Sequence, residues 1–326
     1  MEVRHFVDGI EVAQVLLVRD VEPRRKRDGA EFLRLELGDR TGSVSAMVWD
    51  DVEAVRGLCQ AGDPIHVSGR YEVSPRWGGR LNLTALRPAR ADEYSPEELL
   101  DGPARDPDQM ERDLRELLAT IHNPHLHGLL RLVFDTASPV WASYRDAPAA
   151  KRYHQAYRHG LLEHCLTVAQ AVGALSAIFP GIDRDVAVTG ALLHDIGKLE
   201  AYELEGGAIE MSHEGRLMGE IPLGYYRVRR AIERLEGFPD QLGEAVLHII
   251  LSHHGSLEHG SPVVPCTREA TLVHMVDNLG GRLGSFDRLE KQLPAGEQWT
   301  TFDKALGGGA YFSARPEEER QQQEAA

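Results

Sequence analysis

An adjacent histidine and aspartate, His194-Asp195, end a strongly hydrophobic run in this 326-residue chain. The run 186–193 predicts a buried helix, with Asp185 as its N-cap. Burying an imidazole or a carboxylate alone costs free energy, so the pair must contact each other or bind a third group. Both groups are good ligands for divalent cations. A dipeptide alone does not distinguish a metal site from a hydrogen-bonded pair at a helix end.

Three further segments place ligand-type side chains on buried helices. His164 borders a hydrophobic stripe with helical spacing, His253-His254 follow the hydrophobic run 246–251, and Asp277 interrupts the run 270–279. A single histidine of this kind is more often a hydrogen-bonded core residue, whereas an unpaired buried aspartate is unusual. Together, the four segments offer enough nitrogen and oxygen donors for one or two divalent ions.

The first 90 residues have the pattern of a small β-barrel. Strands are predicted at 10–19, 31–37, 43–48, 64–71 and 80–86, with turns at 27–29, 38–42 and 76–79. A short helix is predicted at 51–58, between the third and fourth strands. This order is that of an OB-fold, a partly open barrel that often binds oligonucleotides.

Aromatic rings and guanidinium groups would let this barrel hold a single nucleic-acid strand by base stacking and phosphate contacts. The candidate residues are Phe32, Arg34, Trp49, Tyr71, Arg76, Trp77 and Arg80. In the alternative interpretation, the rings fill the barrel and the arginines are solvated.

Composition divides the chain into unlike parts. Hydrophobic residues make up 42% and charged residues 27%, as in ordinary soluble globular proteins. Residues 1–90 carry 14 basic and 14 acidic side chains, so the whole net charge of −15 lies beyond residue 90. We expect a barrel at 1–90, a proline-rich acidic linker at 91–108, a helical domain at 109–306 and a disordered tail at 307–326. Within the helical domain, a short hairpin is predicted near Tyr202–Met211.

The cellular setting follows from what the sequence contains. The chain shows no signal sequence and no run of about 18 hydrophobic residues, so we expect no membrane span. Three widely spaced cysteines favour a reducing cytoplasm over a disulfide scaffold. The oligomeric state stays open, a homo-oligomer included.

A family resemblance adds to this pattern. His164, His194-Asp195 and Asp277 resemble the H…HD…D signature of the HD-domain metal-dependent phosphohydrolases, over roughly residues 150–285. The phrases at 157–164, 193–198, 251–255 and 260–262 resemble the YhaM-type 3′–5′ exoribonucleases, in which an N-terminal OB domain precedes an HD domain. The resemblance spans about residues 5–285 and implies a multidomain protein, an all-β OB-fold barrel followed by an all-α HD domain.

The resemblance also implies roles for the ligand-type residues. One divalent ion would be bound by four side chains, and Asp195 would bridge to a second ion that two neighbouring histidines serve. The implied ligands are His164, His194, Asp195 and Asp277 for the first ion, and His253 and His254 for the second.

Lys198 and Glu220 each allow more than one interpretation. Lys198 lies one helical turn after His194 and would hold the phosphate charge, or else is a solvated lysine at a helix end. Glu220 stands where the family has a histidine in a Leu-Leu-Gly-His-Ile phrase. As an oxygen ligand, Glu220 would favour a hard ion such as Mn²⁺ or Mg²⁺. Alternatively, His213 takes that place, or the second site is weak or lost.

The implied activity is metal-dependent 3′–5′ hydrolysis of single-stranded RNA, with DNA as a further candidate substrate, to nucleoside 5′-monophosphates. Two ions are expected, with Mn²⁺ first and Mg²⁺, Fe, Co and Ni as alternatives. The cation would lower the pKa of a water that attacks phosphorus in line, and Asp195 would orient that water. Lys198 would stabilise the developing charge. The rival functions are hydrolysis of a small nucleotide and non-catalytic single-strand binding by a degenerate HD site.

Overall fold

The computed structural model describes residues 1–26, 29–74, 78–99, 102–103, 105–151, 155–205, 208–293, 297–304 and 306–313. The chain divides into two compact units. The first joins Met1–Leu100 with the described residues from Ser285 onward, and the second is Asp101–Gly284.

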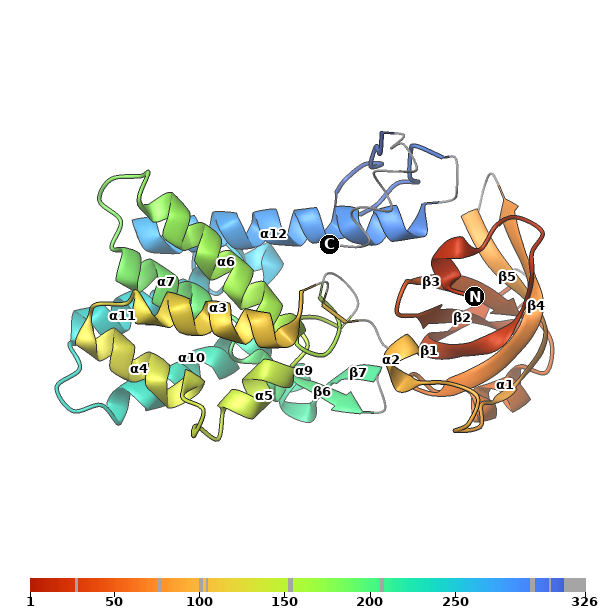
Figure 1. Cartoon of the computed structure of the whole chain (residues 1–326), viewed down its shortest axis with the longest axis horizontal. Helices are drawn as coiled ribbons and strands as arrows, with labels where there is room; N and C mark the ends of the chain where they lie inside the picture. The colour runs from red at the N-terminus through yellow and green to blue at the C-terminus, as the bar shows by residue number, and fades with distance from the viewer. Residues whose placement is uncertain are drawn as a thin grey trace. The chain divides into compact units, whose positions relative to one another are not determined.

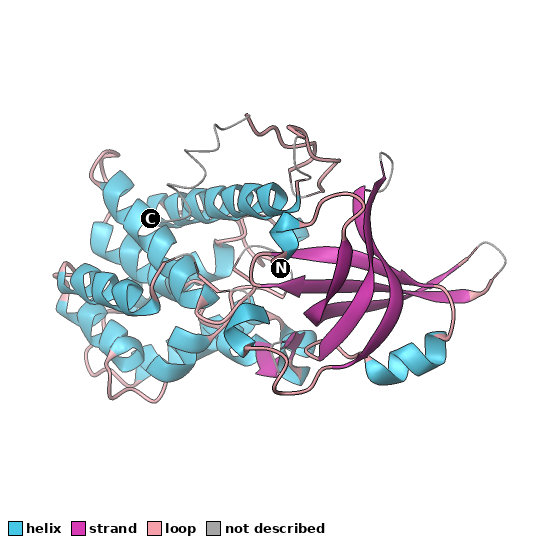
Figure 2. Ribbon diagram, turned by 45° about the vertical axis from the view of Figure 1, so that its right-hand side comes forward, coloured by secondary structure: helices cyan, strands magenta, loops and turns pink. Residues whose placement is uncertain are grey.

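The first unit contains a closed β-barrel. Its strands are β1 (Glu11–Arg25), β2 (Glu31–Asp39), β3 (Gly42–Val48), β4 (Pro64–Ser74) and β5 (Gly78–Pro88). They follow the spatial order β1-β2-β3-β5-β4, and the β3–β5 pair is parallel while the other pairs are antiparallel (Figures 1 and 2). Helix α1 (Val52–Leu58) connects β3 to β4, as the sequence predicts. The predicted OB-fold barrel is therefore confirmed.

Alternating burial closes the barrel around its own core. Leu33, Leu35 and Leu37 on β2 are fully buried, and Val44, Ala46 and Val48 on β3 point to the same interior. Residues at alternate positions of a strand face the same side, which is why this pattern predicts the strands from sequence. A 3-10 helix, η1 (Val3–His5), and a short helix, α2 (Pro96–Leu99), flank the barrel in sequence.

The second unit is helical, with one small hairpin. Its elements are α3 (Pro107–Ala119), α4 (Pro124–Phe134), α5 (Trp141–Asp146), α6 (Gly160–Ser176), α7 (Arg184–Leu193), α8 (Lys198–Ala201), β6 (Tyr202–Glu205), β7 (Ala208–Met211), α9 (His213–Met218), α10 (Glu220–Glu233), α11 (Asp240–Ser252), η2 (Leu257–His259) and the part of α12 (Arg268–Gln292) that precedes Ser285. The predicted all-α domain and its hairpin near Tyr202–Met211 are both present.

Helix α7 packs against α6 and α11 (Figure 1). Every residue from Val186 to Leu193 is buried, as the hydrophobic run predicts. A side chain added at Gly190 would place its Cβ 2.3 Å from Cδ1 of Ile249 on α11, so the glycine allows the close approach of the two helices. The end of α7 is consequently fixed deep in the hydrophobic core.

The structure differs from the sequence-based expectation at the start of α7 and at the end of α12. The N-cap of α7 is Asp183, which accepts a hydrogen bond from the amide of Val186, and not Asp185. The carboxylate of Asp185 instead accepts bonds from the amides of His122 and Asn123. Helical structure was expected to residue 306 and a tail from 307, but α12 ends at Gln292.

Beyond α12, two isolated bridges pair Trp299 with Tyr311 and Asp303 with Gly308. The rest of the expected tail, 314–326, lies outside the described residues, as do Arg76 and Trp77 and part of the predicted turn at 27–29. Among the described helices, none has both the length and the hydrophobicity that crossing a membrane requires.

Candidate metal centre

Four helices of the second unit deliver the ligand-type side chains to one place. His164 projects from the first half of α6, and Asp277 from α12. His194 and Asp195 occupy the turn that follows α7, and His253-His254 follow α11 in the same way. All but Asp277 and His254 are buried, with exposures of 3% or less.

The turn after Asp195 packs directly on another helix. A Cβ added at Gly197 would lie 2.0 Å from the carbonyl oxygen of Glu220 and 2.4 Å from the amide of Gly224, both on α10. Only glycine permits this contact, because no larger side chain fits between two backbones. Gly197 thus lets α10 support the turn that carries the histidine and the aspartate.

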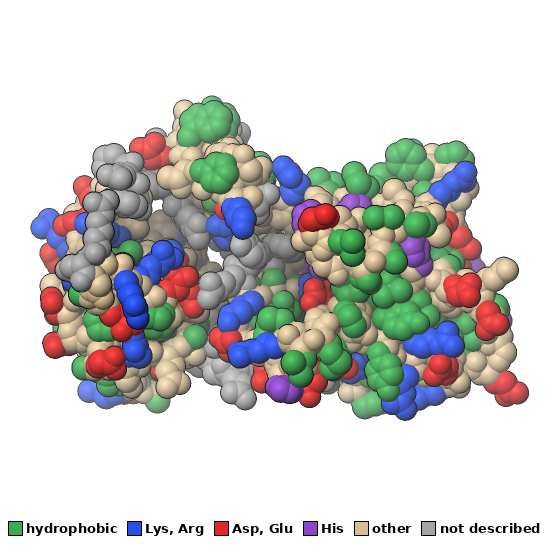
Figure 3. Space-filling model, turned by 180° about the vertical axis from the view of Figure 1, so that it is seen from behind, with side chains coloured by type: hydrophobic (Ala, Val, Ile, Leu, Met, Phe, Trp, Pro, Cys, Tyr) green, Lys and Arg blue, Asp and Glu red, His purple; other side chains and the backbone are tan. Residues whose placement is uncertain are grey.

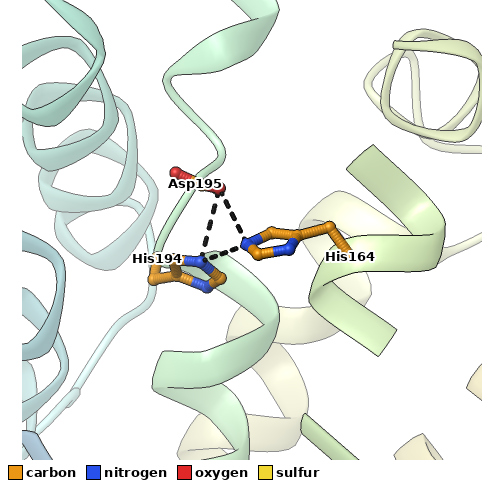
Figure 4. A group of neighbouring side chains, drawn as sticks. All are labelled: His164, His194 and Asp195. Carbon is orange, nitrogen blue, oxygen red and sulfur yellow. Dashed lines mark hydrogen bonds and ion pairs between the residues drawn. The ribbon is translucent and has the colours of Figure 1, made fainter. Parts of the chain in front are cut away.

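The ring nitrogens and carboxylate oxygens converge within a few ångströms. Nε2 of His164 lies 3.2 Å from Nε2 of His194, 3.2 Å from Oδ2 of Asp195 and 3.1 Å from Oδ1 of Asp277. Nε2 of His194 is 3.3 Å from Oδ2 of Asp195. The two rings point toward each other and toward the carboxylate (Figure 4).

For His194 and His253, a hydrogen bond at the Nδ1 edge of the ring fixes the tautomer. Nδ1 of His194 lies 2.7 Å from the carbonyl oxygen of Ala191, and Nδ1 of His253 lies 2.8 Å from that of Ile250. A carbonyl oxygen only accepts, so each Nδ1 carries a proton and donates it. In a neutral ring, Nε2 is then a lone pair aimed at the cluster, which is the arrangement of metal-bound histidines.

One contact in the cluster brings two hydrogen-bond acceptors together. Nε2 of His253 faces Oδ1 of Asp195 at 3.5 Å, and neither buried atom has a hydrogen-bond partner in the part of the chain that the structure describes. Two opposed lone pairs repel each other, and each buried polar atom without a partner costs free energy. A cation between them resolves both problems, so the residues present fit a bound divalent ion.

The charge balance of the site also favours cations. Burial by itself would raise the pKa of Asp195, but the charges of Lys198 and His194 hold it well below its usual range. Burial would also raise the pKa of Asp277, but its hydrogen bond to His164 and the charges of His194, His164 and His253 together lower it. For His164, burial is outweighed by hydrogen bonds to both carboxylates, which raise its pKa to about 9. The cluster therefore attracts positive charge even as it excludes water.

Three overlapping groups of donor atoms, each within 4.8 Å, could hold a metal ion among the described residues. Their members are His164, His194 and Asp195; His194, His253 and Asp277; and Asp195, His253 and His254. Asp195 takes part in two of the groups. Its Oδ2 faces His164 and His194, and its Oδ1 faces His253. The ligand-type residues of the sequence prediction meet here, with the exception of Glu220.

Glu220 begins α10 and is half-buried, and it is in none of the three groups. Its charge nevertheless reaches the site. Burial and His253 lower the pKa of His254, while the charges of Asp195, Asp277 and Glu220 act in the opposite direction. His213, the sequence alternative to Glu220, is exposed on α9.

Lys198 is not a solvated residue at a helix end. It begins α8, its side chain is 11% exposed, and Nζ lies 2.6 Å from Oδ2 of Asp195. Burial would lower its pKa, but Asp195 more than compensates and raises it. A charged ammonium group therefore stands beside the carboxylate that two donor groups share.

Sequence reasoning missed two residues behind the ligands. Nδ1 of His274 lies 2.7 Å from the carbonyl oxygen of His253, and its ring occupies the space that a Cβ of Gly255 would need. Gln155 contacts His164 through its side chain. A histidine one turn before Asp277 on the same helix was a signal for the first, whereas Gln155 carries no such signal.

The residues proposed for nucleic-acid binding divide into two kinds. Trp49 is 47% exposed, stacks on Phe32 with ring centroids 4.6 Å apart, and has Nζ of Lys26 5.2 Å from its ring centroid. Arg34 is instead held by Ser45, Glu36 and Glu22.

Tyr71 is half-buried and packs on Phe6, with centroids 5.6 Å apart, while Arg80 is also half-buried. Acidic and basic side chains are interspersed over the barrel unit on the face drawn in Figure 3. For binding of a nucleic-acid strand, the exposed ring of Trp49 therefore favours base stacking over contacts between phosphates and a uniformly basic surface.

The helical unit belongs to a known class of domain. Residues 161–281 match the HD domain family, and this range contains all the ligand-type side chains described above. The chain therefore combines an N-terminal OB-fold barrel with an HD domain.

Comparison with characterised proteins extends the likeness to both units. The chain is 29% identical to the 3′-5′ exoribonuclease YhaM of Shouchella clausii (strain KSM-K16) over 301 residues, which cover 90% of this chain and 91% of that protein. It is 28% identical to YhaM of Bacillus subtilis (strain 168) over 299 residues, 89% of this chain and 90% of the relative. The resemblance to YhaM-type proteins that the sequence motifs indicate is confirmed.

Among solved structures, a domain of replication protein A from Methanococcus maripaludis covers 28% of this chain and 94% of its own length. The sequence identity is 15% and the TM-score 0.24. A likeness this distant carries no argument, and the assignment of the barrel rests on its strand order.

Proposed function

We propose that this protein is a metal-dependent 3′–5′ exoribonuclease. The observation that carries the proposal is the convergence of the His194 and His253 lone pairs on the two oxygens of Asp195. The YhaM relatives, similar over nine tenths of the chain, are named as 3′-5′ exoribonucleases. Hydrolysis of a small nucleotide alone is less favoured, because those relatives match the barrel unit as well as the HD domain.

The proposed ligand set is the one that the family resemblance implies, and all its members except Glu220 belong to the donor groups. One ion would be held by His164, His194, Asp195 and Asp277, and a second by Asp195, His253 and His254, with Glu220 as a further oxygen ligand. The imidazole donors of this set suit Fe, Co and Ni, and its carboxylate donors suit Mn²⁺ and Mg²⁺. We assign Mn²⁺ as the native ion and the cytoplasm as the compartment.

Bound divalent ions supply Lewis-acid stabilisation of charge on the phosphoryl group and lower the pKa of water. The residues of the chain supply position and charge. Asp195 orients the attacking water toward phosphorus, opposite the leaving 3′ oxygen, and Lys198 donates a hydrogen bond to a phosphoryl oxygen. The buried walls around α7 exclude bulk water, which strengthens each of these interactions.

On the barrel, Trp49 and Phe32 would stack on bases, which makes binding tolerant of sequence because every base has a stacking face. Single-stranded RNA is the proposed substrate, and DNA a second one. Arg34, Tyr71, Arg76, Trp77 and Arg80 remain predicted contacts. A homo-oligomer is compatible with this assignment and is not required by it.

The test uses a 5′-labelled single-stranded oligoribonucleotide with a panel of divalent ions. Stepwise shortening of the labelled strand and release of nucleoside 5′-monophosphates are expected with Mn²⁺. A phosphorothioate linkage at the 3′ end should block the reaction, and one at the 5′ end should not. Shortening from the other end, or equal cleavage of both blocked strands, would contradict the proposal.

The variant Asp195→Asn has nearly the same shape but removes the shared negative charge. We expect a loss of at least about 10³-fold in kcat, since several kcal/mol of charge stabilisation depend on the bound ions. Glu244→Gln changes an exposed carboxylate on α11 and serves as the matched control. Full activity of Asp195→Asn would refute the metal-centre assignment.

A further inference from the structure

The histidines of the metal centre differ in what holds Nδ1. For His194, His253 and His254, the partner is a backbone carbonyl oxygen, at 2.7, 2.8 and 2.9 Å. His164 lies inside α6, where neighbouring carbonyls already accept helical hydrogen bonds. Its Nδ1 faces a side chain instead, with Oε1 of Gln155 at 3.1 Å.

The backbone of Gln155 is held in an uncommon conformation. Its φ angle is +57°, a left-handed value that costs a non-glycine residue free energy. Its carbonyl oxygen accepts a hydrogen bond from the amide of Ala149, at 3.1 Å. A Cβ added at Gly160 would lie 2.0 Å from that same oxygen, so the loop seats on the start of α6 only because residue 160 is glycine. A strained backbone angle persists only where the surrounding structure holds the residue in place, and such residues cluster at functional sites.

In the hydrogen bond between His164 and Gln155, the imidazole is the donor, because an amide oxygen only accepts. When the amide oxygen of Gln155 accepts, Nδ1 of His164 keeps its proton, and Nε2, which faces Asp195 and Asp277, is the nitrogen that can exchange a proton for a metal ion. Second partners of this type set the tautomer, ring direction and basicity of a metal-bound histidine. A neutral amide does this without adding a negative charge to a site that already has two carboxylates.

We propose that Gln155 is a positioning residue for the first metal site, acting by fixing His164 with Nε2 toward the ion. The proposal rests on the metal-dependent function and adds to it a residue outside the ligand set. Side chains of Gln and Glu have the same length, whereas Asn is one methylene shorter. Asn also tolerates the left-handed conformation well. Gln155→Asn therefore removes the contact without straining the loop, and Gln155→Glu retains an acceptor.

The experiment measures binding of Mn²⁺ by calorimetry and the visible spectrum of the Co²⁺-loaded protein, alongside kcat and KM for an oligoribonucleotide. For Gln155→Asn, we expect the Kd of one Mn²⁺ site to rise about 10–100-fold. A changed Co²⁺ spectrum, recovery of kcat at high Mn²⁺ and an unchanged KM should accompany it. Gln155→Glu should restore affinity to within a few fold of the wild type.

His159→Asn is the matched control, because His159 lies in the same loop with φ +68° and its Nδ1 faces the carbonyl of Arg145. Its Mn²⁺ affinity should equal that of the wild type. Unchanged affinity in Gln155→Asn, or an equal loss in His159→Asn, would overturn the positioning role and leave the proposed function intact. A wild-type protein that binds no divalent ion would overturn both.

Discussion

Gly197 shows how little space surrounds the metal centre. Its φ and ψ angles, −68° and −12°, are open to any residue, so backbone freedom is not the reason for glycine there. The constraint is steric, because α10 lies against its α-carbon. A methyl group at this position must push α10 away from the turn that holds Asp195.

Gly197→Ala should therefore destabilise the fold by about 1–3 kcal/mol, the usual cost of overpacking, and lower Mn²⁺ affinity together with activity. Thermal unfolding and calorimetry measure the two effects. Gly128→Ala on α4 is the control, since the nearest atom to its added Cβ is Cδ2 of Leu235, at 3.9 Å. That change should stabilise the helix by up to about 1 kcal/mol. Equal stability of the two variants would contradict the steric account.

For Lys198, the proposed function predicts one effect on stability and another on catalysis. Its ammonium group pairs with buried Asp195, so Lys198→Met leaves a buried carboxylate with less compensation. We expect the metal-free protein to lose about 3 kcal/mol of stability. Because bound Mn²⁺ compensates the same carboxylate, the ion should raise the melting temperature of the variant by more than that of the wild type.

Lys198→Met should also lower kcat by about 10²–10³-fold, as expected for removal of one group that stabilises transition-state charge. Steady-state kinetics at saturating Mn²⁺ separates this loss from weaker metal binding. Lys198→Arg keeps the charge and should recover part of the stability. A variant Lys198→Met with wild-type kcat would assign the lysine to folding alone.

At the scale of the element, the end of α7 depends on how the helix begins. Asp183 caps its N-terminus through the amide of Val186 at 3.2 Å, and Asp185 joins α7 to the loop before α4. Asp183→Ala should cost about 1 kcal/mol, a typical value for a lost N-cap. Asp185→Asn keeps an oxygen acceptor for the two loop amides and should cost less. Chemical denaturation ranks the two, and the reverse order would contradict the cap assignment.

These two aspartates also mark the limit of prediction from sequence. A hydrophobic run gives the existence of α7 and its burial, because every face of that helix packs against neighbours. It does not say which of two aspartates two residues apart is the cap, since both precede the run. The barrel was predicted strand by strand because turns rich in glycine and aspartate separate its alternating runs.

The ligand-type side chains that lie together in the candidate site were predictable from sequence, and the residues behind them were not. His164, His194, Asp195, His253, His254 and Asp277 are recognisable because polar side chains interrupt or end hydrophobic helices. Gln155 is different, because its contact depends on a left-handed backbone angle in a loop. The bridge between Trp299 and Tyr311 likewise joins residues whose sequence has no strand pattern.

At the scale of the whole molecule, the proposed function gives strand binding to the barrel and hydrolysis to the HD domain. Trp49 offers an exposed ring on the barrel, and the ligand-type side chains of the three donor groups all lie in the other compact unit. Trp49→Ala should weaken binding of a single-stranded oligoribonucleotide by about 1–3 kcal/mol, or roughly 5–150-fold in Kd. Turnover of a small phosphodiester, bis(p-nitrophenyl) phosphate, needs no strand and should not change.

Trp299→Ala is the matched control, because Trp299 is 63% exposed and lies outside the barrel strands. Fluorescence anisotropy with a labelled oligoribonucleotide gives the Kd of each variant in Mn²⁺-free buffer, where hydrolysis does not interfere. A selective loss in Trp49→Ala identifies stacking on the barrel as the source of affinity. If Trp49→Ala slowed hydrolysis of the small reporter as much as that of RNA, the ring would act through the fold, and the division of work between the units would be wrong.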